Sequence, residues 1–161
     1  MTHFTHCALL TKDTVRNIDV SLQQACDAGE SAIVELMDVL EENILQLCKA
    51  YQDCLKKQIE IIRDASELGP LSSKWDDLPE YRSLSVELSQ ELSNFTAVVN
   101  TIGQMIRNET IKHITQQKKC MNLIAGKHKE LEAILKKQTE EIKKLESKIL
   151  DVKRESIVKA R

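Results

Sequence analysis

The feature that most limits the fold of this chain is its shortage of residues that break helices and make turns. Of 161 residues, only four are glycine and two are proline. β-Sandwiches, barrels and doubly wound α/β sheets need more turn residues than six, because their many short strands are bounded by turns. Aromatic residues make up only 3% of the chain. The sequence therefore predicts an all-α protein made of long helices.

The first long helix is predicted over residues 21–68, and residues 1–20 are expected to hold only a short helix. Apolar side chains in the long segment follow steps of 3, 4 and 4, which is an 11-residue repeat. This period keeps a single apolar seam on a nearly straight helix. The predicted seam consists of Ile33, Leu36, Leu40, Ile44, Leu47, Tyr51, Leu55 and Ile62.

The strongest break in the pattern is Gly69-Pro70. Glycine suits the left-handed position after a helix, and proline cannot continue one. Ser73 and Asp76 have the spacing of an N-terminal cap, and Pro79 is tolerated in a first helical turn. We therefore expect a linker over residues 69–79 and one second long helix over residues 80–161. The two helices would form a long antiparallel hairpin, or coiled-coil rod.

A regular heptad begins at His128, and its 3.5-residue period is typical of a left-handed coiled coil. Position a holds His128, Leu135, Ile142 and Ile149, and position d holds Leu131, Gln138, Leu145 and Val152.

This seam is predicted to be an oligomer interface. A second helix longer than the first leaves part of its apolar face uncovered, and another helix has to bury it. We therefore expect a dimer with itself or with a homologous helical protein. Its candidate interface residues are Leu131, Leu135, Ile142, Leu145, Ile149 and Val152.

Charge is unevenly distributed along the chain, although the net charge is only −2. The first 103 residues carry −9 and the remaining 58 carry +7. A stripe of lysines on one side of a stiff helix suits an anionic surface such as acidic lipid. The alternative is a solvated coiled-coil face on which lysine aids solubility. The candidate lipid-binding residues are Lys129, Lys136, Lys137, Lys143 and Lys144.

No catalytic or cofactor-binding pattern is present in the sequence. His3, His6 and Cys7 are too few for a zinc site, which needs about four ligands at fixed spacing. The five cysteines show no paired spacing, which is typical of a reduced intracellular protein. The four glycines are isolated, so no glycine-rich phosphate loop exists. We expect no enzyme activity, no metal, no cofactor and no nucleic-acid partner.

The linker and the segment after it resemble the F-BAR domains of membrane-bending adaptors. The resemblance is carried by Ser73-Lys-Trp75-Asp-Asp-Leu78-Pro-Glu80, and by the Leu-rich run Leu84-Ser-Val-Glu-Leu88-Ser-Gln-Glu-Leu92. A lysine-rich stretch, 118–161, follows at the place where the family has one. The order of helices also matches over nearly the whole chain, although the sequence stops before a third long helix.

The resemblance implies a crescent-shaped antiparallel dimer whose basic face binds anionic phospholipid. The function expected first is thus a scaffold that binds membranes and links them to the cytoskeleton or to trafficking, as in endocytosis. The alternative is a coiled-coil subunit of a cytoskeletal, centrosomal or vesicle-tethering complex without lipid binding. Neither a signal peptide nor a membrane span is predicted, so we expect a cytoplasmic location, peripheral to membrane or cytoskeleton.

Overall fold

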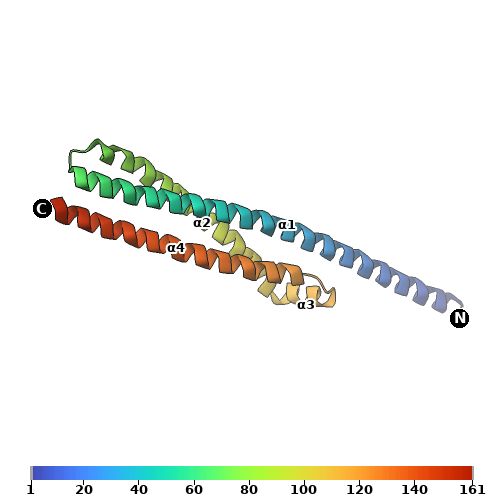
Figure 1. The fold of residues 1–161 in the computed structure, drawn as a ribbon. Helices are drawn as coiled ribbons and strands as arrows, with labels where there is room; N and C mark the ends of the chain where they lie inside the picture. Colours follow the sequence, from blue (N-terminus) through green and yellow to red (C-terminus); the bar gives the residue numbers. More distant parts are fainter. Residues whose placement is uncertain (1, 161) are drawn as a thin grey trace. The chain divides into compact units, whose positions relative to one another are not determined.

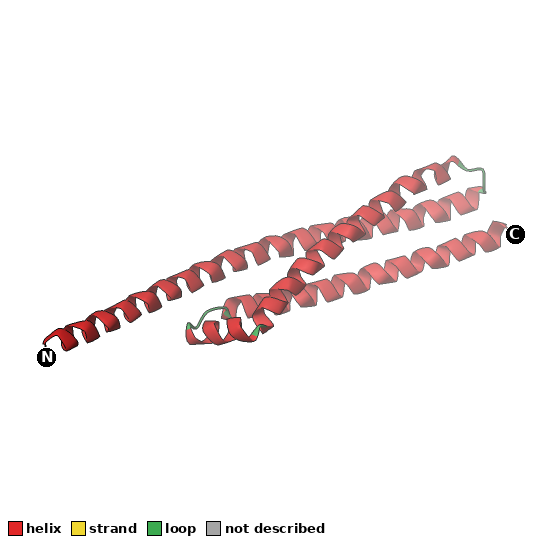
Figure 2. Cartoon of the chain, turned by 180° about the vertical axis from the view of Figure 1, so that it is seen from behind, coloured by secondary structure: helices red, strands yellow, loops and turns green. Residues whose placement is uncertain are grey.

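The computed structural model describes residues 2–160, with side chains from residue 11 onward. No strand occurs in this part of the chain (Figure 2), which confirms the all-α prediction. The elements in Figure 1 are α1 (Thr2–Leu68), the 3₁₀ helix η1 (Ser73–Asp77), α2 (Leu78–Arg107), α3 (Glu109–Gln117) and α4 (Asn122–Ala160).

The chain forms two compact units. The first unit comprises Met1–Asp38 and Thr101–Lys129, and the second comprises Val39–Asn100 and Glu130–Arg161.

Helix α1 is 67 residues long, about 100 Å at 1.5 Å per residue. It begins at Thr2, so the expectation of only a short helix within residues 1–20 is wrong. The physical reason is that no proline or glycine precedes Gly29, and nothing in the sequence ends the helix there. Gly29 itself lies within the helix without interrupting it.

Helix α1 ends at the Gly-Pro pair. Gly69 has φ of +97°, in the left-handed region, and its N–H donates a hydrogen bond to the carbonyl of Ala65 (3.0 Å). The hydroxyl of Ser72 then caps η1 by accepting from the N–H of Lys74 (3.2 Å). Pro79 is the second residue of α2, where its missing N–H costs nothing.

The expected single helix over residues 80–161 is interrupted twice. Asn108 has extended backbone angles, and its side chain accepts a hydrogen bond from the N–H of Ile111 (3.0 Å), which starts α3. After α3, Lys119 (φ 52°) and Met121 (φ 73°) are both left-handed. These residues turn the chain sharply before α4, so α2 and α4 are separate helices.

In the second unit, α2 runs antiparallel to α1 and α4 runs parallel to it. The Tyr81 carbonyl at the start of α2 accepts hydrogen bonds from Gln58 Nε2 and Cys54 Sγ, both at 3.1 Å. Gln52 Nε2 donates to Gln138 Oε1 on α4 (2.8 Å). The apolar core of this unit includes Leu40, Ile44, Cys48, Tyr51, Leu55, Ile59, Ile62, Ala65, Leu78, Val99, Leu131, Leu135, Ile142, Ile149 and Val152.

In the first unit, two ion pairs connect α1 to the later helices. Lys118 Nζ lies 2.8 Å from Asp19 Oδ1, and Lys127 Nζ lies 2.9 Å from Asp38 Oδ1. Each lysine side chain is only 17% exposed. Among the residues of this unit whose side chains are described, the buried ones are Met37, Ile102, Gly103, Cys120, Ile124 and His128.

The buried seam of α1 keeps the predicted repeat but includes residues that sequence analysis omitted. Leu36 is exposed and Leu47 is half-buried, whereas the neighbouring Met37 and Cys48 are fully buried. Two positions shift by one residue, and including Ile59 closes the predicted gap between Leu55 and Ile62, so that the steps of 3, 4 and 4 are continuous. The buried seam is Met37, Leu40, Ile44, Cys48, Tyr51, Leu55, Ile59 and Ile62.

Candidate interaction surfaces

The lysines predicted to bind lipid point away from the buried seam of α4. Lys136, Lys137, Lys143 and Lys144 are exposed in the second unit, and Lys129 is exposed in the first. They occupy positions b and c of the heptad, and positions a and d face the core.

Acidic side chains are interspersed with these lysines. Glu140 and Glu141 follow Lys136 and Lys137 by about one helical turn, and the Glu141 carboxylate lies 3.1 Å from Lys144 Nζ. Residues 136–148 contain five lysines and three glutamates, a net charge of +2. An exposed ion pair contributes little to stability, but the mixed charge reduces the local positive potential. This face of α4 is only weakly basic.

The six residues predicted to form an oligomer interface are covered by the chain itself. All belong to the second unit, five are buried, and only Leu145 is half-buried. The expectation that this seam faces water without a partner is wrong, because the chain turns before α4 and α4 packs on α1 and α2. The six residues are Leu131, Leu135, Ile142, Leu145, Ile149 and Val152.

A different apolar face is left uncovered, on the first part of α1. Val15, Ile18 and Leu22 are 52%, 53% and 47% exposed. They continue the buried seam toward the N-terminus with the same steps of 3 and 4, and Cys26 is the next position. Sequence analysis missed this face because it started the long helix at residue 21. The 11-residue repeat of the buried seam could have revealed it. Val15, Ile18 and Leu22 lie two repeats, or 22 residues, before Met37, Leu40 and Ile44.

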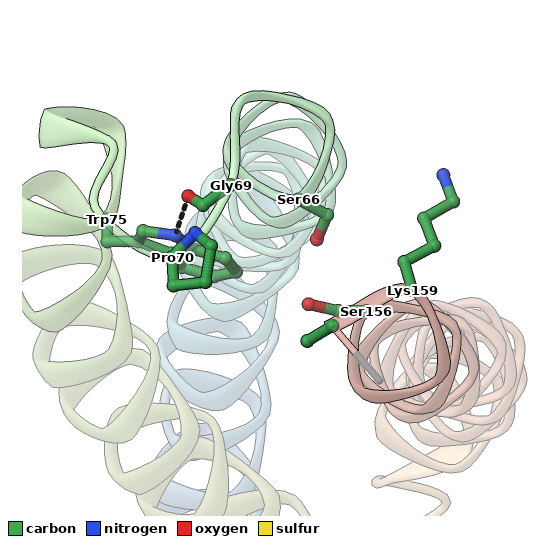
Figure 3. Close-up of a pocket in the computed structure, with 7 residues that line it drawn as sticks. Ser66, Gly69, Pro70, Trp75, Ser156 and Lys159 are labelled. Atoms are coloured by element: carbon green, nitrogen blue, oxygen red, sulfur yellow. Dashed lines mark hydrogen bonds between the residues drawn. The ribbon is translucent and has the colours of Figure 1, made fainter.

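A shallow hollow of about 270 Å³ lies in the second unit, beside the end of α1 (Figure 3). The indole N–H of Trp75 donates to the carbonyl of Gly69 (3.1 Å), which fixes the ring at the rim. The polar side chains that line it are Ser66, Ser156 and Lys159, besides Trp75. None of the lining residues carries a carboxylate or an imidazole, so the hollow lacks a paired acid and base of the kind used in general acid–base catalysis.

Two of the described thiols, Cys48 and Cys120, are buried. Burial raises the pKa of Cys48. Burial also raises the pKa of Cys120 to about 11, together with its hydrogen bond to Cys26 and the charges of Cys26, Glu30 and Asp27. Such thiols are poor nucleophiles at neutral pH.

Three residues that sequence analysis judged too few for a zinc site are outside the part of the chain whose side chains are described. They are His3, His6 and Cys7. Among the described residues, no group of three or more histidine, cysteine, aspartate or glutamate side chains is arranged to hold a metal ion. Within the same part of the chain, no helix is both long and apolar enough to cross a bilayer.

Comparison with protein-family models, with curated proteins and with solved structures finds no match to this chain.

Proposed function

We propose that this chain is a non-catalytic helical scaffold that pairs with a second copy of itself through the first part of α1. The carrying observation is that Val15, Ile18 and Leu22 are exposed on the helix face that is buried farther along α1. In this role the chain would be a coiled-coil subunit of a cytoskeletal, centrosomal or tethering complex. The F-BAR resemblance also implies an antiparallel dimer, and membership of that family stays a prediction.

The order of charges on this part of α1 favours an antiparallel second copy. Residues 12–16 carry Lys12, Asp13 and Arg16, a net +1, and residues 19–30 carry Asp19, Asp27 and Glu30, a net −3. If two copies cross between Ile18 and Asp19, each Val15 opposes Leu22 of the other copy. Lys12 then lies within two residues of Asp27, which places opposite charges beside the apolar contact. Arg16 lies within two residues of Asp19, whose side chain contacts Lys118 of its own chain but is still 61% exposed.

The expected affinity follows from the apolar area that such a pair would bury. Complete burial of one large aliphatic side chain contributes roughly 1.5–3 kcal/mol, and these three are already about half covered. Six side chains in the dimer then contribute about 6 kcal/mol, equivalent to a dissociation constant of tens of micromolar at best.

The test is sedimentation velocity of wild type, Ile18→Glu and Val20→Glu from about 10 to about 500 μM, the range set by the expected affinity. Val20 is a matched control because it is 51% exposed and lies on the opposite side of α1. We expect dimers for wild type and Val20→Glu and a monomer for Ile18→Glu. A wild-type protein that is monomeric at the highest concentration would overturn the proposal, as would equal dissociation of both variants.

A second candidate function is binding to anionic membranes through α4. It is favoured by the exposure of Lys136, Lys137, Lys143 and Lys144. A lysine beside acidic lipid contributes about 1 kcal/mol, but the interspersed glutamates oppose this attraction. The net charge of +2 over residues 136–148 is why we place this function second.

Membrane binding is tested by co-sedimentation with phosphatidylserine vesicles at low and high salt. One variant replaces Lys137 and Lys144 with glutamate, and the control replaces Lys49 and Lys56, which are exposed on α1. If α4 binds lipid, the first variant loses binding, the control keeps it, and salt weakens wild-type binding. Wild type that stays in the supernatant at low salt would leave the lysines as a solubilising face.

A further inference from the structure

Two thiols that are distant in sequence meet in the first unit. The side chains of Cys26 on α1 and Cys120 in the turn between α3 and α4 are hydrogen-bonded to each other. Cys120 is only 5% exposed, and Cys26 is half-buried and therefore reachable from solvent. The other described cysteines, Cys48 and Cys54, are buried in the second unit.

The backbone holds Cys120 in place at a conformational cost. Lys119 and Met121, on either side of it, are both left-handed although neither is glycine. The N–H of Cys120 donates to the carbonyl of Thr115 (3.0 Å). Left-handed non-glycine residues persist only where the surrounding structure imposes them, and such strain tends to occur at functional positions.

Ion pairs keep the same turn close to α1. Lys118 contacts Asp19, which lies two helical turns before Cys26, and Lys127 contacts Asp38, which lies about three turns after it. Because both lysines are mostly covered by protein, these contacts restrict the turn on both sides of the thiol pair. The ion pairs therefore hold the turn that carries Cys120 against the part of α1 that carries Cys26.

We propose that Cys26 and Cys120 form a reversible disulfide that joins α1 to the α3–α4 turn. A small-molecule disulfide such as oxidised glutathione is the oxidant. The Cys26 thiolate attacks it, forms a mixed disulfide and releases one glutathione thiol. The Cys120 sulfur then attacks the Cys26 sulfur, the second glutathione leaves as a thiol, and a dithiol reductant reverses both steps.

The surroundings of the two thiols determine this order of events. Cys26 is the accessible partner, whereas burial and the neighbouring Cys26, Glu30 and Asp27 raise the pKa of Cys120. Lys118 and Lys119 precede Cys120 in the turn, and Lys118 is engaged with Asp19. Cys120 therefore acts as the second nucleophile, where its proximity to Cys26 compensates for its small thiolate fraction.

Closing this disulfide would stabilise the fold against heating. The bond encloses a segment of 95 residues, so it removes much of the freedom of the unfolded chain. For a domain of this size we expect the melting temperature to rise by about 10 °C.

The experiment incubates the full chain with oxidised glutathione and maps peptides by mass spectrometry without reduction. We expect one linked peptide pair that contains Cys26 and Cys120, a loss of two hydrogen masses, and a higher melting temperature that dithiothreitol reverses. Cys26→Ser should show neither change, and Cys7→Ser should behave like wild type. Circular dichroism checks that both variants stay helical.

Three results would overturn the proposal. They are two free thiols after oxidation, a stable glutathione adduct on Cys26 that never resolves, and a linkage to any other cysteine. Peptide mapping of wild type decides among them even if Cys26→Ser does not fold. The proposal does not depend on dimerisation, because the linkage forms within one chain and is measured at concentrations where the chain is monomeric.

Discussion

The imidazole of His128 on α4 lies directly against Gly103 on α2. A Cβ at position 103 would be 2.7 Å from Nε2 and 2.8 Å from Cε1 of this ring. Both residues are buried, and a Cβ contact shorter than 3.0 Å forces a neighbour to move. The absence of a side chain at Gly103 is therefore what lets a histidine occupy an a position of the α4 heptad within the first unit.

The first prediction is that Gly103→Ala destabilises the protein although alanine favours helices. Overpacking typically costs 1–3 kcal/mol, and the gain in helix propensity is only about 1 kcal/mol. We expect a net loss of about 1 kcal/mol in urea unfolding. Gly126→Ala on α4 is the control, since nothing lies within 4 Å of that Cβ, and it should stabilise. If the clash is the cause, Gly103→Ala should cost nothing in a His128→Ala background.

The second prediction concerns Tyr51 and Glu146 in the second unit. The Tyr51 hydroxyl donates to the Glu146 carboxylate (2.9 Å), and burial and this hydrogen bond raise the pKa of Tyr51. Tyr51→Phe should lower the free energy of unfolding by about 1 kcal/mol, because the bond is only partly buried. A double-mutant cycle with Glu146→Ala, which removes the acceptor, measures the coupling. Equal effects of Tyr51→Phe in both backgrounds would show that the bond contributes nothing.

Sequence reasoning predicted the features that depend on local periodicity. The heptad of α4 is one example, since all eight of its a and d positions, including Leu131 and Ile142, are buried or half-buried. The α1 seam is another, with the correction that Met37 and Cys48 replace Leu36 and Leu47. Sequence analysis chose leucine at both places, but helix geometry selects the residue whose angle matches the rest of the seam.

The breaks at Asn108 and at residues 118–121 could not be predicted with the same rules. Neither contains glycine or proline, and Lys119 and Met121 are residue types that rarely adopt left-handed angles. Their conformation depends on tertiary contacts such as the ion pair between Lys118 and Asp19. Asn108 did carry a signal, because asparagine before glutamate is a favoured helix start. The turn at residues 118–121 decides whether the α4 seam faces a second chain or the chain's own helices.

The third prediction is that Gly69→Ala weakens the end of α1. Gly69 has φ of +97°, and left-handed angles cost other residues about 1–2 kcal/mol. We expect a loss of about 1 kcal/mol in urea unfolding monitored by the fluorescence of Trp75, the single tryptophan of the chain. Gly69→Asn is the control, because asparagine tolerates left-handed angles better, and it should lose less. An unchanged midpoint for Gly69→Ala would contradict the cap.

The last prediction is a difference in alkylation between the two thiols of the first unit. Burial raises the pKa of Cys120 to about 11 from its ordinary value of 9.0. Only the thiolate reacts, so at pH 8 the native Cys120 should react with iodoacetamide far more slowly than Cys26. Its rate should rise about tenfold per pH unit until the pH approaches the raised pKa. The measurement is peptide mass spectrometry of the reduced protein after timed labelling. In guanidinium the protection should vanish, and both cysteines should then react at the same rate. Native Cys120 that labels as fast as Cys26 at pH 8 would show that the turn does not cover it.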